Sequence, residues 1–507
     1  MIPVLTLLTA IPAVAALLAL LAGSRAGLAK TIGLIAGVAS LLLSLWVWFG
    51  VGKTGEMQLV ERAAWIPELG IWYHLGVDGL GALMLLLAAI VSLMAIAASR
   101  KLVSQPGLYF ALILLLESGL FGTFTALNFF HWFLFWELSL IPAFFLIKLW
   151  GGEGPGRAAT QFFVYTMVGS VALLLSFLAL YFATGTMEFE VFGRMADTGE
   201  LASDVAAHLG PISLWLALAT LLGFAVKVPL MPFHTWLPAT YSKAPTPVTM
   251  LLTGAMSKMG VYGLLRIALP IFGAQLAEVR TPLLVLATLT VVAGAWAAAV
   301  QKDLKRIFAY SSVNHLGYCL LAIFAVALPA ASPASDTLSR AAALDGVILQ
   351  MFNHGLTAAV IFWFLAMLES RSNGLLGLHD FGGLRKPAPV FCGLMGIALF
   401  SSLGLPGLNG FVSEFLIFRG VFPLTWVSAT VSVLGLLITA AVILTVIQSV
   451  FTGPVPERWS AFPDLTTAER FAVAPALILM ALLGLAPQMI LGTVNATVLH
   501  WLAGWRF

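Results

Sequence analysis

The sequence predicts an all-α polytopic membrane protein with about fourteen transmembrane helices. Of its 507 residues, 61% are hydrophobic and only 9% are charged. The mean hydropathy of +1.02 is far above that of a soluble domain. Apolar stretches of about 20 residues recur along the chain, each long enough to cross about 30 Å of hydrocarbon as a helix. The strands of a membrane β-barrel would be half as long and would alternate in polarity, so a helical bundle is expected.

The predicted helices follow one another with short connections. In chain order they cover residues 3–23, 30–50, 79–98, 107–127, 129–149, 160–184, 212–232, 247–270, 281–300, 305–328, 344–369, 388–418, 426–451 and 471–491. The first stretch has no basic segment before it and no cleavage site, so we expect a retained helix rather than a signal peptide. Cys319 and Cys392 have no metal-ligand spacing and are expected to be small buried residues. Dinucleotide- and ATP-binding motifs do not occur, so redox or ATP chemistry would belong to another chain.

The basic residues in the connections predict the orientation of the chain. The odd-numbered connections hold 15 of the 25 lysines and arginines, against 7 in the even-numbered connections and the C-terminal tail. The odd set comprises Arg25, Lys30, Arg100, Lys101, Lys148, Arg157, Lys243, Lys302, Lys305, Arg306, Arg371, Arg385, Lys386, Arg458 and Arg470, and the even set comprises Lys53, Arg62, Arg194, Arg280, Arg340, Arg419 and Arg506. We therefore expect the odd connections to face the cytoplasm and both termini to face the outside.

Two predicted spans contain residues that should break a helix. The seventh contains Pro229 and Pro232. The twelfth contains Pro406 between two glycines. Proline removes a backbone donor and clashes one turn back, and non-helical backbone at membrane depth is tolerated only inside protein or beside water. The alternative is that the prolines only kink packed helices.

The two breaks lie five spans apart, so the broken segments should cross the membrane in opposite directions. This is typical of inverted repeats with an ion path where the broken helices meet. We expect inverted five-helix repeats over spans 4–8 and 9–13. The predicted regions are N-terminal helices over 1–106, a first repeat over 107–270, a second repeat over 271–451 and a C-terminal helix over 452–507.

Ionisable side chains lie inside several predicted spans: Glu137 in the fifth, Lys227 in the seventh and Lys258 in the eighth. A charge at the centre of a bilayer costs about 2.5–3.5 kcal/mol on insertion scales, so such residues favour a function in moving charge. Glu414, after the twelfth-span break, would supply a carboxylate in the second half. The alternatives are structural: a glutamate that binds a neighbouring helix, a lysine that reaches the interface, a fixed counter-ion or an interfacial carboxylate.

His315 and His354 lie in the tenth and eleventh spans, between Lys258 and Glu414 in chain order. Histidine exchanges protons near neutral pH, so both are candidate proton relays. The alternative is that each is a hydrogen-bonded core residue.

Hydroxyl and imidazole groups near these spans could extend a proton path. Ser311 and Ser312, in the tenth span, are candidates to hold water. His234 follows Pro232 near the cytoplasmic end of the seventh span and is a candidate proton-uptake group, or a structural histidine.

Six segments resemble the antiporter-like subunits of respiratory complex I, and the resemblance covers nearly the whole chain. They are FWELSLIP at 135–142, KVPLMPFHTWLP at 227–238, KMGVYGLLR at 258–266, DLKRIFAYSS at 303–312, NHG at 353–355 and GLPGLNGFVSE at 404–414. Within that family, a glutamate after the twelfth-span break and a chain that ends soon after the last span resemble the M-type subunit, called the D subunit in photosynthetic complexes. L-, N- and Mrp-type relatives usually have lysine there. Residues 238–243 depart from the family's Asp-Ala-His pattern, which leaves cytoplasmic proton uptake open.

The resemblance implies a proton-translocating subunit of an NADH (or ferredoxin):quinone oxidoreductase, with no redox chemistry on this chain. Glu137 and Lys227 would form a modulating ion pair, and Lys258 would be the central carrier. His315 and His354 would link the halves, and Glu414 would pass the proton outward. Quinone reduction elsewhere would drive this transfer.

The resemblance implies no cofactor or metal on this chain. NAD(H) or ferredoxin, FMN, iron–sulfur clusters and quinone would belong to partner subunits. The expected partners are L-, N- and K-type membrane-arm subunits and lipid, without nucleic acid, in the inner (plasma) or thylakoid-type membrane of a bacterium. The alternative function is an Mrp-type Na⁺/H⁺ antiporter subunit, which sodium dependence would distinguish. A structural spacer is the third reading, and the buried charges weigh against it.

Overall fold

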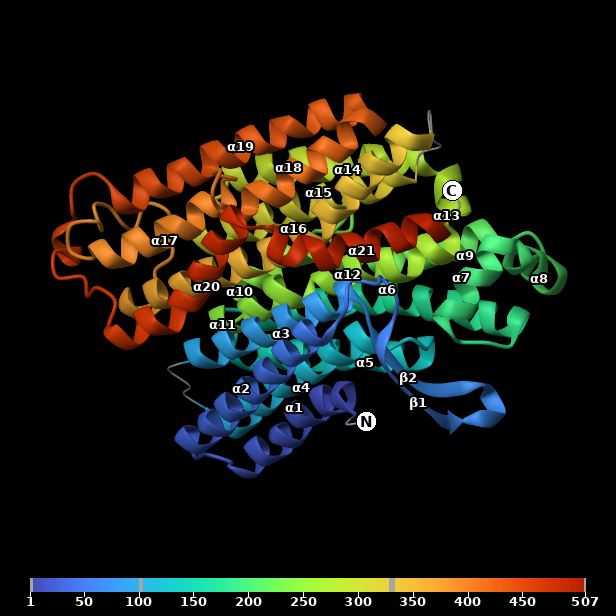
Figure 1. Cartoon of the computed structure of the whole chain (residues 1–507). Coiled ribbons are helices and arrows are strands. Elements are labelled where there is room, and N and C mark those ends of the chain that lie inside the picture. The colour runs from blue at the N-terminus through green and yellow to red at the C-terminus, as the bar shows by residue number, and fades with distance from the viewer. Residues whose placement is uncertain (1–2, 100–103, 328–332, 506–507) are drawn as a thin grey trace.

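Long helices run side by side through the molecule, and a β-hairpin projects from one end of the bundle (Figure 1). The computed structural model describes residues 3–99, 104–327 and 333–505. The elements are α1 Val4–Leu21, α2 Ala26–Gly50, β1 Gln58–Ile66, η1 Pro67–Leu69, β2 Ile71–Val77, α3 Gly79–Ala98, α4 Pro106–Thr125, α5 Phe129–Trp150, α6 Pro155–Thr184, α7 Phe189–Thr198, α8 Glu200–Leu209, α9 Ser213–Lys227, α10 Trp236–Lys243, α11 Thr246–Leu251, η2 Leu252–Met256, α12 Lys258–Gly263, η3 Leu264–Ala268, α13 Leu269–Glu278, α14 Arg280–Ala299, α15 Leu304–Val326, α16 Pro333–Arg371, α17 Pro389–Ser402, α18 Asn409–Leu424, α19 Trp426–Phe451, η4 Glu457–Trp459, α20 Thr467–Leu485 and α21 Gln488–Gly504.

Within the described residues, 12 helices are long and apolar enough to cross a membrane. One of them is the run Thr246–Glu278, which comprises α11, η2, α12, η3 and α13. The predicted seventh and twelfth spans are not among them, because α9 in the seventh has only 15 residues and the twelfth is divided into α17 and α18. The polytopic helical class is confirmed, while the number of fourteen spans and the repeat boundaries stay predictions.

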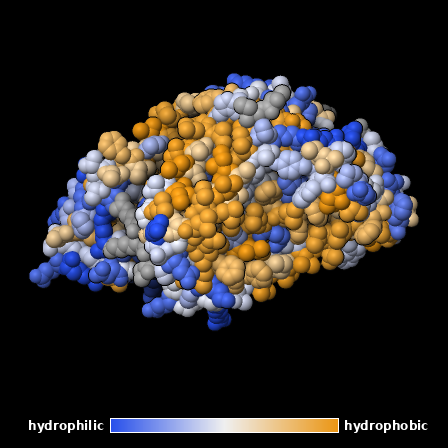
Figure 2. All heavy atoms as spheres, turned by 90° about the horizontal axis from the view of Figure 1, so that it is seen from below, coloured by the Kyte–Doolittle hydropathy of each residue, from blue (hydrophilic) through white to orange (hydrophobic). Residues whose placement is uncertain are grey.

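The flank of the bundle is apolar where lipid would cover it. Figure 2 shows a hydrophobic band across one face, with hydrophilic residues toward both ends of the molecule. On α2, Ile35 is 66% exposed and Phe49 is 80% exposed. Large apolar surfaces of this kind are unfavourable in water and are expected where a protein meets membrane.

The connections gather at two ends of the bundle, as an alternating path requires. At one end, which we call the basic end, Leu378 N donates to Lys302 O at 2.7 Å and Gly152 N donates to Lys243 O at 2.8 Å. At the other, the hairpin end, Leu127 N donates to His74 O at 2.9 Å. In these contacts, odd-numbered connections bind other odd-numbered connections, and even-numbered connections bind other even-numbered ones. Of the basic residues counted above, Arg100, Lys101 and Arg506 lie outside the described residues.

Several elements differ from the sequence prediction, among them α7 and α8, which lie between the predicted sixth and seventh spans. β1 and β2 pair in antiparallel fashion over a stretch to which no element was assigned. The last predicted span, 471–491, ends early because α20 stops at Leu485, before Pro487, and a separate helix α21 follows. Proline disfavours helix in the residue before it, which explains the stop.

A buried ion pair fastens α3 to the long eighth span at the hairpin end. Asp78 accepts from Gly81 N at 3.0 Å and so caps α3, and its Oδ1 also lies 2.5 Å from Arg266 Nη2. The Arg266 guanidinium stacks 5.2 Å from the Trp501 ring of α21. The pair joins three elements without exposing a charge, although Asp78 Oδ2 and Arg266 Nε have no hydrogen-bond partner among the residues described.

Candidate functional site

The helical break after Lys227 is held by a backbone hydrogen bond that spans five residues and by a side-chain hydroxyl. Leu230 N reaches back to Ala225 O at 2.9 Å, and Met231 N donates to Thr290 Oγ1 at 3.0 Å. These bonds satisfy groups that the missing helical turn would leave unpaired. Lys227 is only 2% exposed, at the C-terminal end of α9. A Cβ added at Gly260 would lie 2.5 Å from the side chain of Val228, so only glycine lets α12 approach the break this closely.

Lys227 and Glu137 lie in neighbouring helices, but they do not touch. In the part of the chain that the structure describes, no ion pair joins them, and the buried Oε1 of Glu137 has no hydrogen-bond partner. The Nζ atom of Lys227 lies 4.7 Å from the centre of the Trp136 ring, a cation–π distance. The indole is fixed because its Nε1 donates to Ser170 Oγ at 2.9 Å. The predicted pair is therefore an open one, with an aromatic ring beside the ammonium group.

Lys258 lies at the centre of the polar interior and is 0% exposed. It follows η2, a π-helical turn in which Ser257 N bonds to Leu252 O at 3.0 Å. The wider turn leaves the carbonyl of Thr253 available, and Lys258 Nζ donates to it at 2.5 Å. The same Nζ lies 3.3 Å from Ser257 Oγ and 2.8 Å from His354 Nδ1 on α16. A lysine from the first half of the chain thus contacts a histidine from the second.

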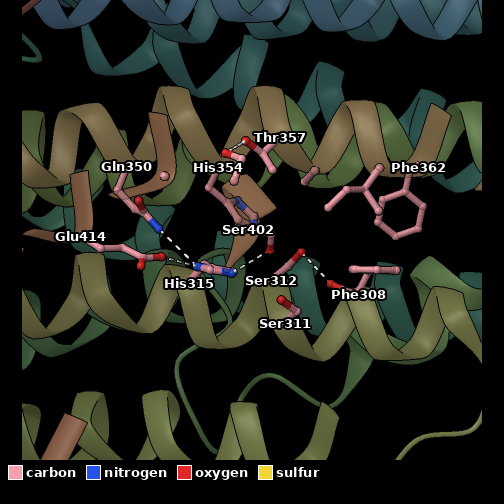
Figure 3. Close-up of a pocket in the computed structure, with 14 residues that line it drawn as sticks. Phe308, Ser311, Ser312, His315, Gln350, His354, Thr357, Phe362, Ser402 and Glu414 are labelled. Atoms are coloured by element: carbon pink, nitrogen blue, oxygen red, sulfur yellow. Dashed lines mark hydrogen bonds and ion pairs between the residues drawn. The ribbon is translucent and has the colours of Figure 1, made fainter. Parts of the chain in front are cut away.

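Two histidines continue from Lys258 to Glu414. The rings of His354 and His315 have centroids 5.1 Å apart, and His315 Nδ1 lies 3.0 Å from Glu414 Oε1. On the other side of the ring, His315 Nε2 lies 3.3 Å from Ser402 Oγ. Glu414 is only 5% exposed. Figure 3 shows the two imidazoles between α16 and α15, with Glu414 and Ser402 on opposite sides of His315.

Neutral polar residues that the sequence did not single out support this row. Gln350 Nε2 lies 3.4 Å from His315 Nδ1, and Ser413 Oγ donates to Gln350 Oε1 at 2.5 Å. Gln350 and Ser413 were missed because an amide or hydroxyl in an apolar helix carries no charge signal. The signal available was their spacing: Gln350 lies four residues before His354 on one helical face.

A small cavity lies beside the histidines. Its volume is about 20 Å³, and its walls include Ser311, Ser312, His315 and His354 (Figure 3). A polar space of this size meets the requirement for holding one water. The two serines predicted to hold water therefore lie where a water could join the rings.

The second break has glycines where the backbone and Glu414 need them. Gly404 and Gly407 have φ of +81° and +94°, which favour glycine. A Cβ at Gly404 would also lie 2.9 Å from Glu414 Oε2. The break is bound to α16, because Asn353 Nδ2 donates to Asn409 O at 2.8 Å. Glu414 thus lies against broken backbone, as its sequence position indicated.

The structure places His234 apart from this row. Its ring lies in the first break, half-buried and 6.5 Å from Tyr310, and its Nδ1 has no hydrogen-bond partner among the residues described. Of the seven predicted residues, the structure thus joins Lys258, His354, His315 and Glu414 in sequence. Glu137 and Lys227 form a second, open group, and His234 belongs to neither.

Comparisons of the sequence and of the structure with known proteins indicate the same family. Residues 126–439 match the family model described as NADH:quinone oxidoreductase/Mrp antiporter, TM. The chain is 33% identical to the F(420)H(2) dehydrogenase subunit M of Methanosarcina mazei, over 92% of this chain and 91% of that protein. It is also 33% identical to the NADH-quinone oxidoreductase subunit M of Rhodobacter capsulatus, over 93% and 90%. Among solved structures, a chain of respiratory complex I from Thermus thermophilus superposes with a TM-score of 0.85 at 28% identity, covering 99% of this chain and 100% of that one.

Proposed function

The chain belongs to the NADH:quinone oxidoreductase/Mrp antiporter membrane family, and from this premise we propose that it carries protons across the membrane as the M-type subunit of a quinone oxidoreductase. It is a membrane-arm subunit of an enzyme complex and works beside other membrane-arm subunits. The relatives include an F(420)H(2) dehydrogenase subunit as well as NADH-quinone oxidoreductase subunits, so the electron donor is left open.

The row Lys258–His354–His315–Glu414 is the observation that carries this proposal. Its members are buried and joined by a hydrogen-bond distance of 2.8 Å, a ring contact of 5.1 Å and an ion pair of 3.0 Å. Amine, imidazole and carboxylate groups can each accept and release a proton. In a structural spacer, apolar residues would fill this volume without the cost of burying charge.

The residues divide into a modulating group and a conducting row. A change in the separation of Glu137 and Lys227 would alter the electric field at Lys258. Lys258 lies in α12, the helix whose Gly260 packs against the first break. Lys258 would then release its proton to His354, His354 would pass one to His315, and His315 would pass one to Glu414, which delivers it at the hairpin end. Quinone reduction on partner subunits would drive the change. His234 remains a candidate proton-uptake group at the first break.

The wider assignments follow the same proposal. The basic end would face the cytoplasm and the hairpin end the outside, with both termini outside, in a bacterial plasma or thylakoid-type membrane. Residues 107–270 and 271–451 would be inverted repeats. FMN, iron–sulfur clusters, quinone and the electron donor would be held by other subunits, and the neighbours in the membrane would be K-, L- and N-type subunits.

The test is proton pumping by the whole complex, reconstituted in liposomes, with Lys258→Ala in this chain. Quinone reduction by the donor that the purified complex oxidises is measured in parallel, and assembly is checked on a native gel. We expect an assembled complex whose pumping and coupled turnover fall by about a hundredfold, the scale of losing one proton-transfer group. Normal pumping by the assembled variant would contradict the proposal.

The second candidate is an Mrp-type Na⁺/H⁺ antiporter subunit, because the matching family model covers both kinds of protein. The M-subunit relatives over about nine-tenths of the chain favour the first reading. Sodium decides between them: antiport requires that proton movement in liposomes stop when Na⁺ is replaced by choline, whereas a quinone-driven pump is unaffected.

A further inference from the structure

A large polar cavity opens at the basic end, away from the row described above. Its volume is about 680 Å³, and residues from α3, α5, α10, α15 and α16 line it. Its charged lining residues include Glu153, Lys243, Asp303, Lys305 and Glu369. A cavity of this size with many polar walls is expected to fill with water. Water therefore reaches some distance into the bundle from the end that carries most basic residues.

One carboxylate in the wall of this cavity is bound on its inner side. Lys305 Nζ donates to Glu369 Oε1 at 3.1 Å and to Ala244 O at 3.3 Å, and Thr246 Oγ1 donates to Glu369 Oε2. The side chain of Glu369 is 35% exposed, whereas that of Lys305 is 6% exposed. Glu369 thus faces the cavity with one side and the buried start of α11 with the other.

A stripe of hydroxyls leads from this carboxylate toward Lys258. Thr246, Thr249, Thr253 and Ser257 are spaced by three or four residues, so they share one face of α11 and η2. All four are at most 3% exposed. Neighbours on this face are about 5–6 Å apart, within reach of one bridging water.

The far end of the stripe meets the central lysine and the histidine cavity. The hydroxyl of Tyr241 on α10 lies against Thr253 and Ser257. Thr253 Oγ1 lies 3.1 Å from Ser312 Oγ, and Ser257 Oγ lies 3.3 Å from Lys258 Nζ. The stripe therefore sets hydroxyl groups about one helical turn apart from Glu369 to Lys258, and Thr249 Oγ1 donates to Tyr241 O at 3.1 Å.

We propose that Glu369 is the proton-loading residue of this subunit, taking protons from the water of the basic-end cavity and passing them along the Thr246–Ser257 hydroxyl stripe to Lys258. This inference rests on the proposed function, because it concerns how Lys258 regains its proton. In each step a hydroxyl gives one proton to the next group and receives one from the group before. One proton leaves the water, and one arrives at the neutral amine of Lys258.

The arrangement suits uptake better than a purely structural ion pair. A structural pair would need only Lys305 and Glu369, which bind α15 to α16. The contact from Thr246 adds a donor at the first position of the stripe, and the exposure of Glu369 lets water reach the carboxylate.

The test compares two carboxylates that line the same cavity. Glu369→Ala removes the proposed loading group, and Glu153→Ala removes an exposed carboxylate that lies outside the stripe and serves as the matched control. Pumping and quinone reduction are measured on the whole complex in liposomes, with assembly checked on a native gel. We expect Glu369→Ala to lower coupled turnover by about tenfold or more, and Glu153→Ala to stay near the native rate.

Chemical rescue separates a proton-transfer role from a structural one. Formate, a small carboxylate that can enter the cavity, should restore a measurable part of the turnover of Glu369→Ala, and Glu369→Asp should retain more turnover than Glu369→Gln. A loss that formate does not restore, or equal rates for the Asp and Gln variants, would overturn the inference.

Lys258→Ala, run beside these variants, keeps the two proposals distinct. If Lys258→Ala stops pumping while Glu369→Ala pumps normally, only the loading role of Glu369 fails. If Lys258→Ala itself pumps normally, the proposed function fails first.

Discussion

At the first helical break, Lys227 and Glu137 lie near each other without contact, whereas at the second break Glu414 binds His315 at 3.0 Å within a row that reaches Lys258. The difference indicates different tasks. A buried, unconnected charge pair is sensitive to separation: closing from about 8 Å to about 4 Å changes the attraction by about 2 kcal/mol at an effective dielectric constant of about 20. In a hydrogen-bonded row the groups are already in contact, so their attraction changes little. Such a row can instead pass protons from one group to the next.

The largest loss of pumping is expected when Glu414, the last residue of the conducting row, is replaced. Glu414→Gln keeps the shape of the side chain and an oxygen beside His315 Nδ1, but it cannot take up a proton. We expect pumping to fall by about a hundredfold, measured by dye quenching in liposomes that contain the whole complex. Glu414→Asp should retain part of the activity. A Gln variant that pumps as fast as native would show that the second break does not conduct.

A smaller loss is expected in the middle of the row. His315→Gln removes the imidazole between His354 and Glu414, but the neighbouring cavity of about 20 Å³ can hold a water that bridges the gap. We therefore expect a loss of about tenfold, within the range of a single relay group. The rate in D₂O should fall further in this variant than in the native complex. A loss as complete as that of Glu414→Gln would mean that water does not replace the ring.

A still smaller effect is expected at the open pair. Trp136→Phe weakens the cation–π contact to Lys227 and removes the indole bond to Ser170. Such a contact is worth about 1 kcal/mol, so we expect coupled turnover to change by about fivefold or less. The measurement is turnover with and without an uncoupler. A complete loss of pumping would show that Lys227 conducts protons itself and that the two regions are alike.

Breaking a third buried pair, Asp78–Arg266, should not change pumping per assembled complex, because this pair touches neither region. Asp78→Asn leaves Arg266 buried without its carboxylate. Breaking such a pair costs about 3–5 kcal/mol, so the complex should dissociate at a lower temperature on native gels after heating. Reduced pumping by complexes that remain assembled would instead link the hairpin end to proton transfer.

The helix breaks, the two ends of the bundle and the buried charges could be predicted from the sequence, because each has a strong local signal. Pro229, Pro232 and Pro406 lie in the broken segments, and the connections gather at the ends expected from their odd and even order. Lys227, Lys258 and Glu414 are buried and lie in apolar stretches of sequence, where a charge is a visible exception. Sequence order also anticipated that the histidines lie between Lys258 and Glu414.

The rest depends on contacts between helices far apart in the chain. Gln350 and Ser413 are ordinary polar residues until α16 and α18 bring them to His315. The π-turn η2 has no sequence rule, and the spacing of the stripe that ends at Ser257 does not reveal that Glu369 of α16 lies at its start. The β-hairpin is too short and too polar to be predicted as a membrane span. Helix α21 begins at Gln488, inside the last predicted span, so it was not recognised as a separate helix. Lys227 lies over the Trp136 indole, and spacing alone does not place that ring.

Arginine in place of each lysine tests most directly whether the first region modulates and the second conducts. Arginine keeps the positive charge but does not release its proton. Pumping and turnover are measured on assembled complexes that carry Lys227→Arg or Lys258→Arg. The account predicts that Lys227→Arg retains most of its pumping and that Lys258→Arg loses it by about a hundredfold. Normal pumping by Lys258→Arg, or its loss only in Lys227→Arg, would contradict the division of the two regions.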